Sequence, residues 1–146
     1  MFSNQITKIL SSNPQTSKMF QGCFPCNNLP DPIPGKALIV NLDPQRYEGS
    51  HWISIYVQTS EQVVYFDSLN LPTSICIIDS FLKDFSTLTR NMKGYQSLNS
   101  DCCAHHCISF IYFLSKGYTF TQYLKMLDKI NDSDIFVQNI VNKMIN

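Results

Sequence analysis

The sequence carries no excess of charge of either sign. Eleven lysine and arginine residues balance eleven aspartate and glutamate residues, and no basic run is longer than two residues. A surface that binds the phosphates of nucleic acid or the headgroups of an anionic membrane needs a concentration of positive charge. The composition therefore argues against either kind of broad binding surface.

The sequence also lacks the marks of export and of a membrane span. Residues 1–5 do not have the charged and then apolar pattern of a signal peptide, and no apolar run is long enough to cross a bilayer. We therefore expect an intracellular protein that is not secreted and does not enter a membrane. In a reducing compartment its six cysteines should be mostly free thiols, which points to chemistry or metal binding rather than to disulfides.

What the sequence does contain is enough apolar material for a folded core. Of its 146 residues, 44% are hydrophobic and 12% are aromatic, and it has no internal repeat and no low-complexity tract. These values are typical of a globular domain. We expect one domain that covers residues 1–146 and acts as a monomer.

The spacing of apolar residues predicts helices around a small sheet. A short apolar run at 36–42 indicates a buried strand, and alternation over 51–57 and 63–66 indicates an antiparallel hairpin. A further short strand is predicted at 95–98, and four prolines make 24–35 an extended loop. Helices are predicted at 4–10, 72–85, 103–115, 121–129 and 133–144. The expected fold class is α+β, with helices flanking a mostly antiparallel sheet.

A histidine and an aspartate stand at the two ends of the predicted hairpin. His51 opens the first strand, and Asp67 follows the second. In an antiparallel pair the start of one strand lies beside the end of the other, so the two side chains should meet. His51 can then act as a general base and later as a general acid, while Asp67 holds the imidazole in the required tautomer.

A cysteine nucleophile and an oxyanion donor are predicted further along the chain. Cys103 lies in the first turn of the predicted helix if Ser100 or Asp101 caps it, and backbone N–H groups there favour a thiolate. Gln96, seven residues earlier, can donate its side-chain amide to an oxyanion, together with a backbone N–H at or next to Cys103. The order histidine, aspartate, glutamine, cysteine is that of a cysteine peptidase.

These residues and their neighbours resemble the adenovirus-type (adenain-like) cysteine endopeptidases, above all the versions of Polinton/Maverick elements and related DNA viruses. The resemblance rests on His51-Trp52, on Tyr-Phe-Asp-Ser at 65–68, and on the glutamine, serine, aspartate and cysteine positions of 96–107. It extends to Lys-Ala-Leu-Ile-Val-Asn at 36–41 and to Leu-Pro at 71–72, and it covers about residues 20–118.

The resemblance implies a papain-like α+β fold and a thiol protease that cleaves viral structural precursors, often after small residues such as glycine. It assigns His51 as the base and Asp67 as the acid that orients it. It also assigns Gln96 to the oxyanion hole and Cys103 as the nucleophile.

The resemblance also bears on substrate and partners. Trp52 and Ser100 are expected to contact the substrate, while Ala104 stands where the family usually has glycine and should crowd the substrate mildly. No cofactor and no metal ion are expected. The expected partners are a protein or peptide substrate and, as in the adenoviral relatives, a small activating peptide. Those relatives bind DNA through a basic surface, but this neutral chain should bind DNA weakly or not at all at physiological salt.

The position of the nucleophile has one competing assignment. The proteases that remove SUMO-type and ubiquitin-like modifiers share the fold and the residue order, but their glutamine stands six residues before the cysteine. Counting six from Gln96 gives Cys102, and counting seven gives Cys103. Ser100 and Cys107 fit the viral spacing, so we favour Cys103 and an endopeptidase, with a modifier-removing isopeptidase as the alternative.

Two interpretations without catalysis are also open. Cys23 and Cys26 have zinc-like spacing, and Cys102 and Cys107 could complete a set of four ligands. Cys107 is explained more simply as a core residue, because it shares a helix face with apolar side chains. The domain could also keep the fold for binding alone.

Overall fold

The computed structural model describes residues 1–43, 51–72 and 74–146, and its fold class is α+β, as expected. One five-stranded sheet has the order β1-β2-β3-β4-β5. Its strands are β1 (Phe20–Pro25), β2 (Ala37–Asn41), β3 (Trp52–Val57), β4 (Gln62–Phe66) and β5 (Thr87–Arg90). The helices are α1 (Ser3–Ser12), α2 (Thr16–Met19), α3 (Ser74–Ile77), α4 (Asp79–Leu82), α5 (Cys103–Ser115), α6 (Phe120–Asp128) and α7 (Ser133–Ile145).

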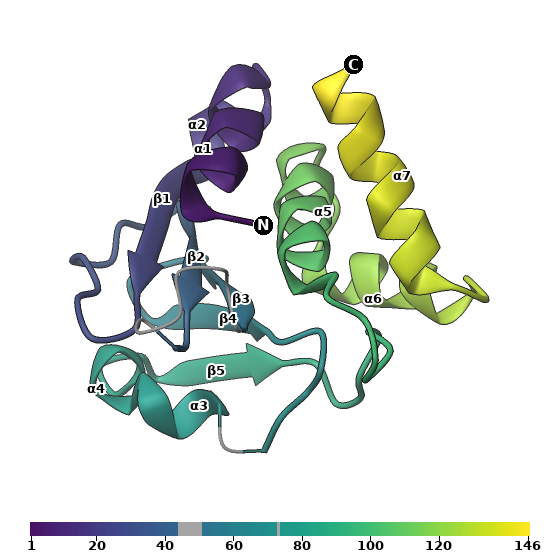
Figure 1. Ribbon diagram of the computed structural model, residues 1–146. Coiled ribbons are helices and arrows are strands. Elements are labelled where there is room, and N and C mark those ends of the chain that lie inside the picture. Colours follow the sequence, from purple (N-terminus) through teal and green to yellow (C-terminus); the bar gives the residue numbers. More distant parts are fainter. Residues whose placement is uncertain (44–50, 73) are drawn as a thin grey trace.

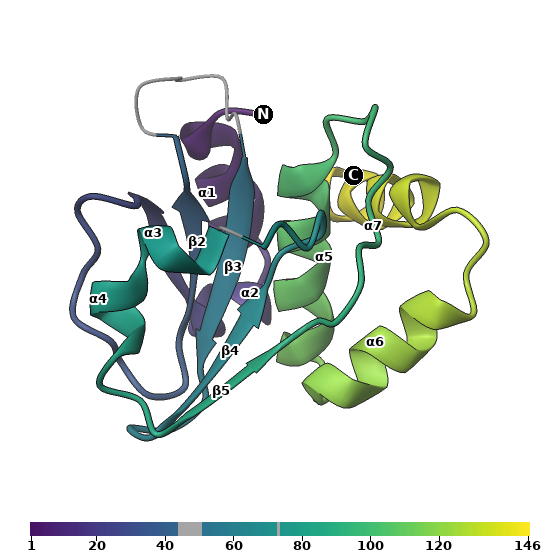
Figure 2. The same ribbon diagram turned by 90° about the horizontal axis from the view of Figure 1, so that it is seen from below.

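Helices cover both faces of the sheet (Figures 1 and 2). Along β2, Ala37 and Ile39 pack into a cluster with α1, α5, α6 and α7, whereas Leu38 and Val40 pack into a second cluster with α4. This separation follows from the alternation of side chains along a strand. The strands β2, β3 and β4 are therefore buried on both faces, and α5 packs directly against β3.

The hairpin and the long helix predicted from the sequence are confirmed. β3 and β4 pair antiparallel, with Ser54 opposite Phe66 and Val57 opposite Val63. The helix expected at 103–115 is α5, with the same bounds. The three shorter predictions at 4–10, 121–129 and 133–144 correspond to α1, α6 and α7.

The expectation of a mostly antiparallel sheet was wrong. β1 pairs with β2 and β4 pairs with β5 in parallel, so only the two central pairings are antiparallel. β1 was missed because its first half has no alternating apolar pattern and its end reaches Pro25. A proline is tolerated there because β1 is an edge strand.

Two further elements differ from the prediction. The strand expected at 95–98 is a loop, because the N–H groups of Tyr95 and Gln96 both donate to the carbonyl of Ser68 rather than to a strand; the fifth strand is instead β5. The single helix expected at 72–85 is divided into α3 and α4 at Ile78, whose φ of −116° and ψ of 24° are not helical.

Two other expectations concern a loop and the absence of a membrane span. The polar loop predicted at 43–50, with a turn at Gly49, lies almost wholly outside the described residues. Among the helices that the structure describes, none has the length and apolar character that a membrane span requires.

Candidate active site

The ends of three elements meet at one point: the start of β3, the end of β4 and the start of α5. His51 directly precedes β3, Asp67 directly follows β4, and the antiparallel pairing sets them side by side. The His51 Nε2 atom lies 2.7 Å from Asp67 Oδ1. His51 is 8% exposed and Asp67 is fully buried, so water hardly competes for this contact. The predicted histidine–aspartate pair is therefore present.

Cys103, the first residue of α5, lies close to this pair. Burial alone would lower the pKa of His51, but the Asp67 hydrogen bond and charge and the Cys103 thiol outweigh it and raise the pKa to about 9. The Nδ1 atom of His51 makes no hydrogen bond of ordinary geometry within the described residues. The sulfur of Cys103 is therefore close enough to affect the imidazole but does not form a regular hydrogen bond with it.

The Asp67 carboxylate is held by backbone donors as well as by His51. The N–H of Leu69 donates to Oδ1 at 3.0 Å, and the N–H of Leu71 donates to Oδ2 at 2.9 Å. Burial would raise the pKa of Asp67, but the hydrogen bond and charge of His51 and the donor at Leu71 lower it overall. Asp67 is therefore ionised at neutral pH, and its carboxylate is held in one orientation.

The backbone of Asp67 is held in turn by Asn91, which no sequence signal marked. The N–H of Asp67 donates to Asn91 Oδ1 at 3.0 Å, and Asn91 Nδ2 donates to the carbonyl of Asp67 at 2.6 Å. Asn91 Nδ2 also donates to the carbonyl of Lys93 at 2.9 Å, and the side chain is fully buried. Asn91 thus joins the end of β4 to the loop after β5.

We expect Asn91→Ala to lower the free energy of unfolding by about 2–4 kcal/mol, because it leaves several buried backbone groups without partners. The measurement is urea unfolding followed by tryptophan fluorescence. The neighbouring Met92 is 87% exposed, so Met92→Ala is a matched control and should change stability by less than about 0.5 kcal/mol. Equal effects of the two substitutions would contradict a supporting role for Asn91.

Gln96 is fixed at both ends of its side-chain amide. Its Oε1 atom accepts a hydrogen bond from Ser68 Oγ at 2.7 Å, and its Nε2 atom donates to the carbonyl of Ser100 at 3.0 Å. An amide nitrogen has two hydrogens, so one N–H has no partner among the described residues. Gly94 lets the backbone pass close to this turn, because a Cβ there would lie only 3.3 Å from the carbonyl oxygen of Leu69.

The predicted cap of α5 needs a correction. Cys102, not Ser100 or Asp101, occupies the N-cap position, and it makes no side-chain capping bond. Ser100 Oγ is only at the limit of hydrogen-bond distance, 3.5 Å from the Cys102 nitrogen. Cys103 is nevertheless in the first turn, 5% exposed, where the helix N–H groups are free to face an anion.

Cys102 and Cys103 face different partners. The Cys102 sulfur accepts a hydrogen bond from Gln138 Nε2 of α7 at 2.9 Å, and burial raises the pKa of this thiol. Cys103 instead interacts with His51. Of the two cysteines, Cys103, which stands seven residues after Gln96, is therefore the one that contributes to the raised pKa of His51.

Trp52 and Ser100 have supporting positions. Trp52 is 3% exposed, packs in the core, and its Nε1 donates to the Met1 carbonyl at 3.3 Å. The Ser100 carbonyl anchors Gln96. Contact of either residue with a substrate stays a prediction.

The zinc alternative finds no support in the geometry. Within the described residues, no group of three or more histidine, cysteine, aspartate or glutamate side chains is arranged to hold a metal ion. Cys107 is fully buried in the core cluster, and Cys26 Sγ lies 3.6 Å from the carbonyl of Leu42.

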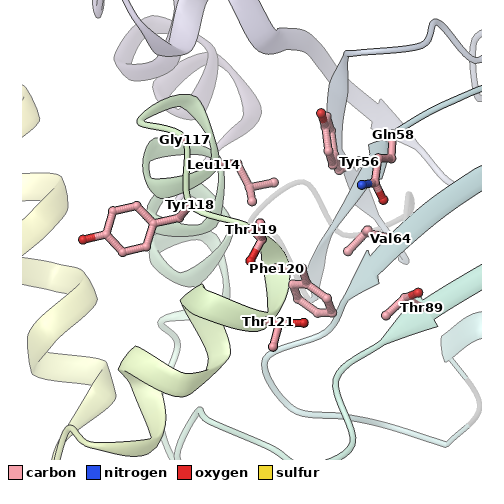
Figure 3. A pocket seen from close by; sticks show the side chains of 10 residues that line it. All are labelled: Tyr56, Gln58, Val64, Thr89, Leu114, Gly117, Tyr118, Thr119, Phe120 and Thr121. Atoms are coloured by element: carbon pink, nitrogen blue, oxygen red, sulfur yellow. The ribbon is translucent and has the colours of Figure 1, made fainter.

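A separate pocket of about 380 Å³ lies at the opposite end of α5 (Figure 3). Tyr56, Val64 and Thr89 line it from three neighbouring strands, and Phe120 lines it from the start of α6. Figure 3 shows the ring of Tyr118 pointing away from the strand residues. None of the four candidate catalytic residues lines this pocket.

Comparisons with known proteins add a fold likeness but no family. The chain matches no known family and no curated protein. Among solved structures it is similar to the central domain of the uncharacterized protein Lpg1148 from Legionella pneumophila, with a TM-score of 0.54 and 11% identity. The match covers 99% of this chain and 98% of that one. At this identity the likeness concerns the fold alone.

Proposed function

We propose that this protein is a cysteine peptidase in which Cys103 is the nucleophile and His51 is the acid and base. The observation that carries the proposal is the buried contact of 2.7 Å between His51 Nε2 and Asp67 Oδ1, with Cys103 interacting with the same imidazole. A raised pKa keeps the imidazole protonated at neutral pH, and an imidazolium stabilises a neighbouring thiolate.

The proposed reaction has two halves. The Cys103 thiolate attacks the peptide carbonyl carbon, and the C–N bond breaks as the His51 imidazolium gives its proton to the leaving amine. Water then attacks the thioester carbon, His51 takes a proton from it, and the C–S bond breaks to release the carboxylic acid and the thiolate. Asp67 stabilises the imidazolium and fixes its tautomer throughout.

When the thiolate attacks, negative charge develops on the carbonyl oxygen, and hydrogen-bond donors that are already in position stabilise it. The free N–H of Gln96 and the backbone N–H groups at the start of α5 supply them. Because Ser68 and Ser100 hold the amide at both ends, no reorganisation of Gln96 is needed when the oxyanion forms.

The substrate class follows from the resemblance to adenain-like enzymes: peptide bonds after small residues such as glycine, in viral or virus-derived structural precursors. A modifier-removing isopeptidase of the SUMO type is the alternative. The spacing of seven residues from Gln96 to Cys103 favours the endopeptidase, because Cys102 contacts Gln138 rather than His51.

Labelling with a peptide electrophile that ends in Gly-Gly, at pH 7, tests the proposal. We expect one adduct per chain, on Cys103, by intact mass and peptide mapping. His51→Ala should slow the labelling at least about tenfold, because the thiolate loses its counter-ion. Cys102→Ala is the matched control and should label normally.

Two other labelling results would change the proposal. An adduct on Cys102 would move the assignment toward the modifier-removing proteases. The absence of any selective adduct would favour a domain that keeps the fold for binding, and the peptidase proposal would then be withdrawn.

A further inference from the structure

The first turn of α7 is tied to the loop that carries Gln96. The N–H of Ser97 donates to Asp134 Oδ2 at 3.1 Å. The Ser133 hydroxyl donates to the carbonyl of Tyr95, on the other side of Gln96. Both residues that flank the glutamine are therefore bonded to the same helix end, although more than 30 residues separate them from it.

The same aspartate also holds α5. Its Oδ1 atom lies 2.8 Å from Nε2 of His106, one turn after Cys103 on α5. His106 is fully buried, and its Nδ1 atom has no partner in the described part of the chain. Burial lowers the pKa of His106, so the imidazole is neutral at pH 7 and donates its Nε2 hydrogen to Asp134.

These contacts connect the two parts of the chain that would supply hydrogen-bond donors to the oxyanion. One source is the Gln96 amide, carried by the loop, and the other is the backbone at the start of α5. The hole works only if both sets of donors lie about 3 Å from one oxygen position. The Asp134 carboxylate is bonded to the loop through one oxygen and to α5 through the other.

We infer that Asp134 is a positioning residue that holds the Gln96 loop and the start of α5 at the separation that the oxyanion hole requires. This role rests on the proposed peptidase function. Asp134 is not needed to begin its own helix, because Asp132 is the N-cap of α7 and accepts a hydrogen bond from the N–H of Ile135 at 3.1 Å. Two aspartates in one turn thus have different tasks.

Two reactions of Cys103 separate this role from a general loss of structure. Alkylation by iodoacetamide needs the thiolate and releases iodide, but it places no charge on a carbonyl oxygen. Hydrolysis of a peptide amide ending in Gly-Gly-aminomethylcoumarin needs the oxyanion hole as well. A positioning defect lowers the second rate and spares the first.

We expect Asp134→Ala to lower kcat for hydrolysis by about 10- to 100-fold with little change in KM, because a misplacement near 1 Å has effects of this size. The alkylation rate of Cys103 should stay within about twofold. Asp132→Ala is the matched control: it loses the cap of the same helix and should destabilise the fold, yet leave kcat within about twofold. Should Asp134→Ala fail to fold, Asp134→Asn keeps one acceptor, and an intermediate loss of about 3- to 10-fold is expected.

The inference is overturned if Asp134→Ala keeps its kcat within twofold, or if alkylation and hydrolysis fall together. An equal loss of kcat in Asp132→Ala would also overturn it. If the unsubstituted protein shows no selective alkylation of Cys103, the peptidase function itself fails. That result is distinct, because it appears before any substitution is made.

Discussion

Replacing Asp67 by asparagine is expected to reduce kcat for peptide hydrolysis by up to about 10⁴-fold, which is the size of the corresponding change in serine peptidases. Asparagine keeps one oxygen that can hold a tautomer of His51, but it removes the negative charge that stabilises the imidazolium. It also turns an N–H group toward one of the backbone donors of Leu69 and Leu71. Steady-state hydrolysis of a Gly-Gly peptide amide provides the measurement.

The same substitution should change how stability depends on pH. The pKa of His51 is raised from 6.5 to about 9 in the folded protein, so its contribution is fully present below pH 6.5 and is lost as pH rises through 9. The free energy of unfolding of the unsubstituted protein should therefore fall between these limits, by on the order of 3 kcal/mol. In Asp67→Asn this fall should be largely absent. Identical pH profiles from urea unfolding would contradict the pairing of His51 with Asp67.

Replacing Gln96 by alanine is expected to lower kcat by about 10²–10³-fold, the usual effect of removing one oxyanion donor. Only the transition state carries charge on the carbonyl oxygen, so KM should change little and Cys103 should still react with iodoacetamide at its normal rate. This combination separates Gln96 from His51, whose loss should slow both reactions.

A graded variant sharpens the test of Gln96. Ser68→Ala keeps the glutamine but removes the hydroxyl that holds its Oε1 atom at 2.7 Å. We expect a loss of kcat of about 3- to 10-fold, smaller than for Gln96→Ala, because the amide can still reach the oxyanion. A change of less than threefold in Gln96→Ala would show that the backbone of α5 supplies the stabilisation alone.

Local periodicity was sufficient for the elements that border the site. The hairpin of β3 and β4 and the helix α5 were predicted at close to their observed bounds, since alternation and helical spacing depend only on neighbouring residues. β5 and the break between α3 and α4 were not predicted. The residues of β5 are half-buried or exposed, so they carry little apolar pattern, and their pairing depends on β4.

The residues that hold the site residues in place could not be predicted from the sequence either. Asn91 lies on a loop and Asp134 on a distant helix, and neither belongs to a sequence motif that would mark it. Their importance comes from contacts across 24 and 37 residues, to Asp67 and to Ser97. Ser68 was part of a quoted motif, but its bond to Gln96 was not foreseen.

What the sequence by itself determined is the order of the four candidate catalytic side chains and the strand ends on which His51 and Asp67 stand, because antiparallel pairing brings such ends together. What only the tertiary structure decided is which cysteine meets the histidine. Cys102 lies at the N-cap of α5 and Cys103 in its first turn, and the two side chains face different partners. The packing of α5 between the sheet and α7 directs Cys102 to Gln138 and Cys103 to His51.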